Sequence, residues 1–78
     1  MKIYDPESKK SFRSITLFLT PAEAQELADS AAHLAAHPEK HHHHISDAEY
    51  GREITIAVYT PENRAHFDAE SGRIIDAP

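Results

Sequence analysis

Histidine is the residue type in this sequence whose number and spacing most clearly suit chemistry. Four histidines are consecutive, from His41 to His44, and together with His33 and His37 they place six histidines within twelve residues. A neutral imidazole nitrogen binds zinc, nickel or copper ions, and imidazole takes up a proton at about pH 6.5. The cluster therefore indicates either a metal site or a surface whose charge depends on pH.

Two pairs within this cluster have a spacing that suits chelation. His33 and His37 are four positions apart, so they share one face if this stretch is helical. The second pair is His42 and His44, two positions apart. In a strand the side chains alternate between faces, so this pair would point outward, whereas His43 and Ile45 would point inward. The predicted ligands, for a zinc, nickel or copper ion, are His33, His37, His42 and His44.

The same histidines also permit interpretations without a metal ion. Glu39 or Asp47 could add oxygen ligands, but no established metal-binding signature is present, because no glutamate lies between His33 and His37. One alternative is a solvated polar edge that resists aggregation. Another is a pH switch, since protonation of all seven histidines would change the formal charge from −5 to +2.

The sequence contains no constellation that is typical of an enzyme. It has no cysteine, which excludes a thiol nucleophile and a disulfide framework. Ser46 and Asp47 lie beside the histidines, but there is no Gly-x-Ser-x-Gly motif and no glycine-rich phosphate loop. With two glycines in the chain, there is little backbone freedom for an oxyanion cradle. We therefore expect a non-catalytic protein.

Length and charge restrict the class of protein further. A chain of 78 residues suffices for one hydrophobic core, so we expect a single domain over residues 1–78. The formal net charge of −5 repels nucleic-acid phosphates and favours a basic protein partner. No apolar run approaches the roughly 18 residues of a membrane span, and the first residues lack the apolar core of a signal peptide. We expect a cytoplasmic protein that binds neither nucleic acid nor membrane.

A helix is predicted from about residue 21 to residue 36. Thr20 supplies an N-cap hydroxyl, Pro21 suits the first turn, and Glu23 completes a capping box. Alanines and leucines then recur at the spacing of one helical face. Pro38 disfavours helical geometry in the residue before it, which sets the end of the helix.

Two strands are predicted from alternating apolar residues. Residues 12–19 place Ile15 and Leu17 on one side and Phe18 on the other. Residues 53–59 alternate in the same way and are rich in β-branched side chains, so they form the clearest strand of the sequence. Both segments are expected to pack an apolar face against the helix.

Turns are predicted near both ends of the chain. Residues 4–10 and 67–73 each contain an aromatic-Asp-x-Glu-Ser pattern, which we interpret as a turn between short extended pieces. Thr60 and Pro61 could begin one further helical turn.

These elements predict a two-layer α+β fold of order ββαββ. One amphipathic helix packs on a small, mainly antiparallel sheet. Residues 53–59 are expected between residues 12–19 and the histidine segment, since the most apolar strand is best buried in the centre. The segment from His41 to Ile45 then forms an edge strand.

Aromatic side chains provide the second candidate site. If the helix covers one face of the sheet, the other face is open, unless the C-terminal segment covers it; both alternatives remain. Aromatic residues often anchor interfaces, so the predicted partner-binding residues are Phe18, Tyr50 and Tyr59. A homodimer through the open face or the edge is a further alternative.

The sequence therefore predicts a small acidic protein-interaction module that binds a larger basic protein. In size and charge it is comparable to immunity and inhibitor proteins. The alternative function is a histidine-rich domain that binds or senses zinc, nickel or copper.

Overall fold

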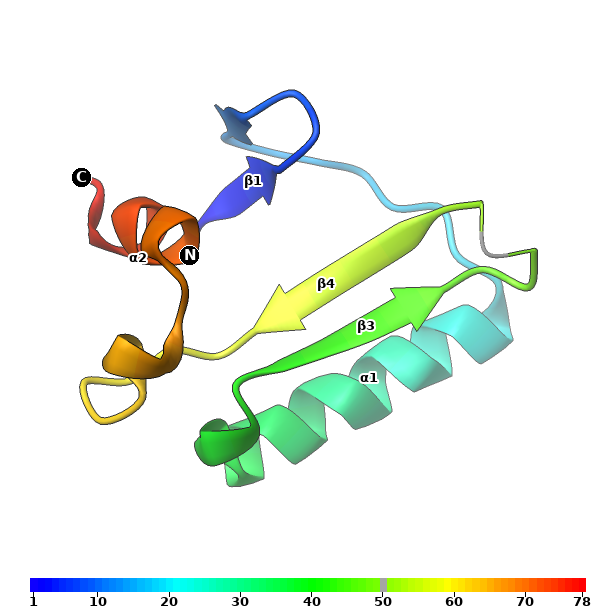
Figure 1. The fold of residues 1–78 in the computed structure, drawn as a ribbon. Coiled ribbons are helices and arrows are strands. Elements are labelled where there is room, and N and C mark those ends of the chain that lie inside the picture. The colour runs from blue at the N-terminus through cyan, green and yellow to red at the C-terminus, as the bar shows by residue number, and fades with distance from the viewer. Residues whose placement is uncertain (50) are drawn as a thin grey trace.

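The computed structural model describes residues 1–49 and 51–78. Tyr50, one of the predicted partner-binding aromatics, lies outside the described residues. The chain adopts an α+β fold in which one β-hairpin precedes the main helix, a second follows it, and a short helix ends the chain (Figure 1). The predicted order ββαββ is confirmed, and the last helix is added to it. The elements are β1 (Ile3–Asp5), β2 (Lys10–Phe12), α1 (Pro21–Ala36), β3 (His42–Ser46), β4 (Glu53–Ala57) and α2 (Ala69–Asp76), with 3₁₀ helices at Pro38–Lys40 and Arg64–His66.

The predicted capping box fixes the start of α1. The backbone nitrogen of Glu23 donates to Thr20 Oγ1 at 3.2 Å, and the backbone nitrogen of Thr20 donates to Glu23 Oε1 at 2.9 Å. Pro21 occupies the first turn, where its missing N–H costs no hydrogen bond. The helix ends at Ala36, two residues before Pro38, so its predicted bounds are confirmed.

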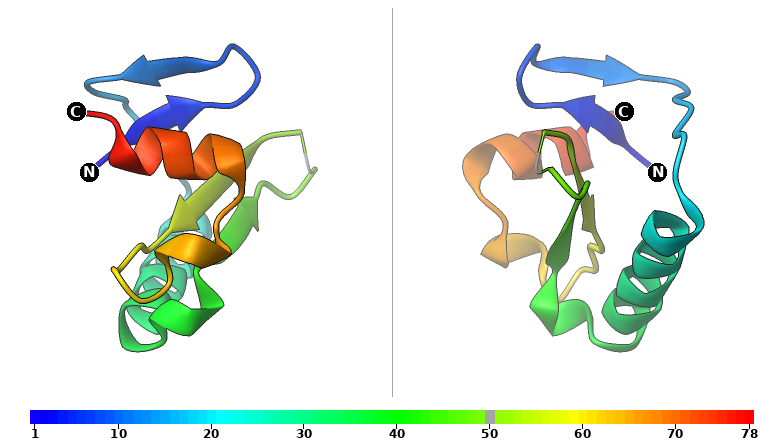
Figure 2. Two further views of the ribbon diagram at one scale, coloured as in Figure 1. Left: turned by 60° about the vertical axis from the view of Figure 1, so that its left-hand side comes forward. Right: turned by 90° about the vertical axis from the view of Figure 1, so that its right-hand side faces the viewer.

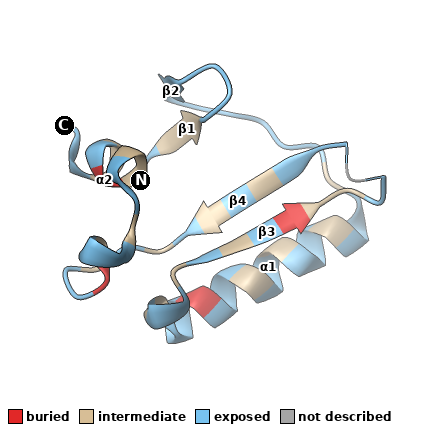
Figure 3. Ribbon diagram, viewed as in Figure 1, coloured by how far each residue is buried: buried red, intermediate tan, exposed pale blue. Residues whose placement is uncertain are grey.

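β3 and β4 form an antiparallel hairpin that packs on α1. His43 pairs with Ile56, and Ile45 pairs with Ile54. Leu34 of α1 and Ile45 of β3 are 0% and 3% exposed and form the buried centre of this layer (Figure 3). The histidine segment is thus an edge strand, as predicted, and its inward side is the side of Ile45.

The arrangement of the strands differs from the prediction. Among the described residues the strands form two separate two-stranded sheets, β1 with β2 and β3 with β4. The predicted strand over residues 12–19 was wrong beyond Phe12, where β2 ends, and β4 is not a central strand. A short turn closes the β1–β2 hairpin at low entropic cost, whereas pairing residues 12–19 with β4 would require a much longer loop.

α2 lies on the side of β3–β4 opposite to α1, and the β1–β2 hairpin crosses above β3–β4 next to α2 (Figure 2). The prediction of a turn over residues 67–73 was wrong, because Asp68 caps a helix there and accepts a hydrogen bond from the backbone nitrogen of Ser71 at 2.7 Å. The same pattern at residues 4–10 does form the turn between β1 and β2. Aspartate serves both as a turn residue and as an N-cap, so the pattern alone could not separate the two cases.

Polar side chains connect α2 and the last residues to β1 and its turn. The hydroxyl of Tyr4 donates to Glu70 Oε1 at 2.6 Å, and Lys9 Nζ lies 3.6 Å from the same carboxylate oxygen. Near the two ends of the chain, Lys2 Nζ donates to the backbone carbonyl of Ala77. The N-terminal residues are therefore joined to α2 and the residue after it by two hydrogen bonds and one ion pair.

One buried amide connects the end of β4 to the loop that follows α1. Asn63 is 4% exposed, and its Nδ2 donates to the carbonyl oxygens of Pro38 at 2.8 Å and Val58 at 2.9 Å. Its Oδ1 accepts a hydrogen bond from the backbone nitrogen of Thr60 at 2.8 Å. This side chain holds the loop from which the histidine strand begins.

Candidate functional site

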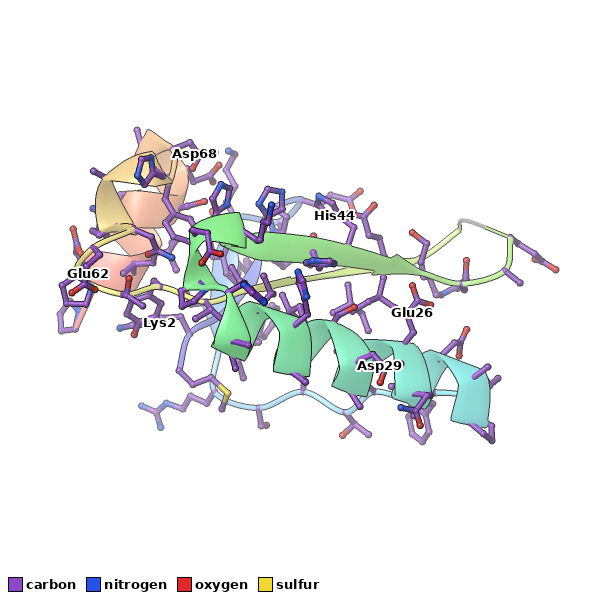
Figure 4. The ribbon with its side chains drawn as sticks, turned by 90° about the horizontal axis from the view of Figure 1, so that it is seen from below. Lys2, Glu26, Asp29, His44, Glu62 and Asp68 are labelled. Carbon is purple, nitrogen blue, oxygen red and sulfur yellow. The ribbon has the colours of Figure 1, made fainter. Side chains whose placement is uncertain are left out.

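The two faces of β3 divide the histidines into two groups. The buried Ile45 marks the face of β3 toward α1, and His42 and His44 project from the opposite face. Figure 4 shows His44 on the side of β3 that is turned away from α1. His33 and His37 lie at the C-terminal end of α1. The structure therefore places the four predicted ligands in two pairs on different sides of the strand.

The group on the α1 side contains a histidine that sequence reasoning missed. The ring of His33 lies 4.9 Å from the ring of His37 and 5.4 Å from the ring of His43, measured between centroids. His37 Nδ1 is 3.2 Å from Glu39 Oε1. The sequence did carry the signal for His43, because alternation places it on the face of Ile45, and that face packs against the helix.

His42 and His44, on the outer face, contact each other and neighbouring side chains. The rings of His41 and His42 stack with centroids 4.7 Å apart, and their Nδ1 atoms are 2.7 Å apart, so one ring must donate to the other. The ring of His42 also contacts that of His44 at 5.1 Å. His44 Nδ1 lies 2.8 Å from Thr55 Oγ1 and 2.6 Å from Glu53 Oε1 on the neighbouring strand.

This crowding lowers the pKa of His42. Partial burial is the largest cause, followed by the positive charges that His41, His44 and His43 carry when protonated. The unfolded chain then binds this proton more readily than the folded chain. Above the ordinary pKa of about 6.5 the group costs no stability, and it destabilises the fold as the pH falls from there through the lowered value.

The side chains do not converge on a metal ion in their present positions. Within residues 1–49 and 51–78, no three histidine, aspartate or glutamate side chains are positioned, as they stand, to hold one. Asp47, a predicted oxygen donor, instead accepts hydrogen bonds at Oδ1 from the backbone nitrogens of Gly51 at 2.8 Å and Arg52 at 3.3 Å. It closes the turn between β3 and β4.

Phe18 lies at an open cavity rather than on a sheet face. Its side chain is 92% exposed. With Leu17 it lines a cavity of about 570 Å³ between the segment before α1 and the free end of the β3–β4 hairpin. The charged residues that line the cavity are Glu23, Asp47, Glu53 and Arg52. Three carboxylates against one guanidinium give this apolar cavity an acidic rim.

Tyr59 lines a different cavity. This cavity has a volume of about 440 Å³ and lies between the outer face of β4 and α2. Phe67 and Ile75 also line it, so the C-terminal segment partly covers the second sheet face. Of the two predicted alternatives for this face, neither holds in full. The structure does not bring Tyr59 together with Phe18.

The chain exposes a large surface for its size. Its accessible surface is 6267 Å², whereas a monomer of 8.8 kDa typically exposes about 4,800 Å². Its radius of gyration is 13.1 Å, against about 11.5 Å for a typical domain of this length. Part of the excess surface lies in the segment from the end of β2 to the start of α1. Its exposed large hydrophobic residues are Phe12, Ile15, Leu17 and Phe18.

Among the helices in the described ranges, none is long and apolar enough to cross a bilayer. In comparisons with known proteins, no family model, no curated protein and no solved structure matches this chain.

Proposed function

We propose that this chain is a small, non-catalytic, cytoplasmic interaction protein that binds a larger basic protein, in the manner of an immunity or inhibitor protein. The observation that carries the proposal is the accessible surface of 6267 Å², which exceeds that of a typical monomer of this mass by about 1,500 Å². A standard interface buries about 800 Å² on each partner, and obligate interfaces bury more. The excess is thus of the size that one partner protein would cover.

The cavity beside Phe18 is the place on this surface that best suits a partner. Leu17 and Phe18 supply exposed apolar contact area, 44% and 92% exposed, next to a concave space. Interfaces draw most of their binding energy from such anchors when the surrounding contacts exclude water. The segment that carries them pairs with no strand in the described part of the chain, so its backbone can also meet a partner.

Charge favours a basic partner over a second copy of this chain. Each copy carries a formal charge of −5, and the rim of the cavity is acidic. A symmetric dimer through this cavity would bring two acidic rims together, which costs free energy. A partner that places lysines or arginines around an apolar side chain would complement the cavity.

The test compares two exposed positions from different cavities. The chain, biotinylated at its N-terminus, captures proteins from lysate as wild type, Leu17→Ser or Tyr59→Ser; the two side chains are 44% and 45% exposed. We expect a partner with net positive charge that is lost with Leu17→Ser and retained with Tyr59→Ser. The purified partner should then bind less tightly as salt concentration rises, because the attraction is screened.

Analytical ultracentrifugation of the purified chain distinguishes a monomer from a homodimer. We expect a monomer at micromolar concentration. A stable homodimer that Leu17→Ser dissociates, or an acidic partner, would contradict the proposal. Equal loss of the partner with both variants would place the interface elsewhere and remove the cavity from it.

A further inference from the structure

We propose that His33, His37 and His43 form a binding site for one divalent transition-metal ion of the zinc class. The site lies between the C-terminal end of α1 and β3, and it does not depend on the partner proposed above. It also differs from the ligand set that spacing alone predicts, since one of its members comes from the inward face of the strand.

The packing of α1 on β3 brings the three side chains together. His33 lies in the last turn of α1, and His37, four residues on, is the C-cap of the helix. His43 is two residues before Ile45, so both project from the face of β3 toward the helix. Leu34, which follows His33 directly, is fully buried, as Ile45 nearly is. The core contact of this layer therefore sets the distance between the helical pair and the strand histidine.

The distances between the rings suit a common ion. Zinc lies about 2.0–2.1 Å from an imidazole nitrogen, so two imidazoles on one tetrahedral ion have centroids about 5 Å apart. The observed centroid distances are 4.9 Å from His33 to His37 and 5.4 Å from His33 to His43. Two of the three ring pairs are thus already spaced for a shared ligand, and the rings must turn before their nitrogens point at one position.

The rings have room to turn toward an ion. The side chain of His37 is 53% exposed, His33 is also exposed, and His43 is half-buried. Among the described residues, the rings of His33 and His43 make no side-chain hydrogen bond that rotation would break. We therefore expect the ion to bind by rotation of these rings about their side-chain bonds.

Glu39 is the positioning residue of this site. Its Oε1 lies 3.2 Å from His37 Nδ1, which can donate its proton to the carboxylate. That bond leaves the Nε2 lone pair of His37 available to a metal. Metal-bound histidines usually donate their second ring nitrogen to a carboxylate or carbonyl in this way, which fixes the tautomer and orients the ring.

The outer histidines do not belong to the site. His42 and His44 project from the opposite face of β3. His44 contacts Glu53, and His42 shares a proton with His41. Three neutral nitrogen ligands without thiolate suit zinc, nickel or copper and leave a fourth position for water, and affinity should rise from zinc or nickel to copper.

The test separates this site from nonspecific binding by the histidine run. Zinc chloride is titrated into the full chain without a histidine tag by isothermal calorimetry at neutral pH. We expect one ion per chain with a Kd below about 10 μM. His33→Ala and His43→Ala should each weaken binding at least about tenfold, the loss that even a missing outer-shell partner causes. The matched controls His42→Ala and His44→Ala should change the Kd less than about threefold.

A second pair of measurements covers folding and positioning. Circular dichroism of each metal-free variant checks that the fold is retained. Glu39→Gln should weaken zinc binding about tenfold while the Tm of the metal-free protein stays unchanged. His42→Ala costing as much affinity as His43→Ala, more than one ion per chain, or no binding at micromolar zinc would overturn the proposal.

Discussion

Different forces hold together the two halves of this molecule. The first half is α1 with the β3–β4 hairpin, and the second half is α2 with the β1–β2 hairpin. α1 and the β3–β4 hairpin meet through buried hydrocarbon at Leu34 and Ile45. α2 and the β1–β2 hairpin meet through polar contacts, such as those of Glu70 with Tyr4 and Lys9. Arg64, in the 3₁₀ helix before α2, donates two hydrogen bonds of 3.0 and 2.5 Å to the carboxylate of Asp76 at the end of α2.

This difference shows that two parts of one chain can differ in how strongly their stability depends on pH, on salt and on side-chain volume. Burial of hydrocarbon depends little on pH and salt, whereas ion pairs at the surface are screened and titrate. The first half should therefore respond mainly to changes in side-chain volume. The second half should respond to acid in the range where its carboxylates titrate, whereas acid acts on the first half through His42, at higher pH. Both candidate sites, the cavity at Phe18 and the three histidines, involve the first half.

The largest effect should come from Leu34→Ala. This side chain is fully buried, so its loss removes transfer free energy and leaves a cavity, at a cost of about 2–5 kcal/mol. A small domain has little stability to lose, so the variant should be largely unfolded at 25 °C. Urea denaturation followed by circular dichroism measures this effect. Phe18→Ala, at a side chain that is 92% exposed, is the control and should change the free energy of unfolding by less than about 0.5 kcal/mol.

The next effect should come from Asn63→Ala. The carbonyl oxygens of Pro38 and Val58 would lose a buried donor, and the free energy of unfolding should fall by about 2–3 kcal/mol. Thermal unfolding measures the change. Because this amide holds the loop before β3, the zinc affinity of any remaining folded protein should fall too. A variant as stable as wild type would show that water replaces the amide without loss.

Acid should separate the two halves of the molecule. The pKa of Glu70 is lowered first by the hydrogen bond from Tyr4 and then by Lys9, and the pKa of Asp76 is lowered first by the hydrogen bond from Arg64. A lowered carboxylate pKa gives stability that is present above the ordinary value, about 4.3 for glutamate and about 3.9 for aspartate, and is lost as the pH falls through the folded value.

In an NMR titration from pH 7 to pH 3, we expect the signals of β3 to respond first, as the histidines protonate. The amide signals of α2 should then shift at lower pH, as Glu70 and Asp76 protonate, while the signals of the buried Leu34 change little in that lower range. Tyr4→Phe should raise the pKa of Glu70 toward its ordinary value. Simultaneous loss of α1 and α2 at one pH would argue that the two halves form one cooperative unit.

The smallest effect should come from Lys9→Gly. Lys9 has a φ of 60° in the β1–β2 turn, where a side chain costs about 1 kcal/mol and glycine does not. The variant should gain up to about 1 kcal/mol, reduced by the loss of the ion pair with Glu70. Lys9→Ala, which loses the ion pair but keeps the strained backbone, is the control. A gain with both variants would show that backbone strain is not the cause.

The elements with complete local signals could be predicted from the sequence. α1 has its capping box at Thr20 and Glu23 and its stop at Pro38, and each of these acts within a few residues. The alternation that divides His42 and His44 from Ile45 is also local, and the structure follows it. Local chemistry of this kind needs no knowledge of distant neighbours.

What depends on distant neighbours could not be predicted. The alternation of Ile15, Leu17 and Phe18 is typical of a strand, yet a strand needs a pairing partner. In the described residues the expected partner, β4, pairs with β3. The role of Asn63 depends on carbonyl groups up to 25 residues away. None of these partners leaves a mark in the nearby sequence.

The contact between Lys2 and Ala77 has a consequence for engineering. Figure 2 shows both ends of the chain on the same side of the molecule. A short linker between them would make the backbone circular, and the irregular segment between β2 and α1 offers a place for new ends. Such a permutant would keep both hairpins and the three-histidine arrangement intact while opening the Leu17–Phe18 segment, so it would test the two proposed sites independently.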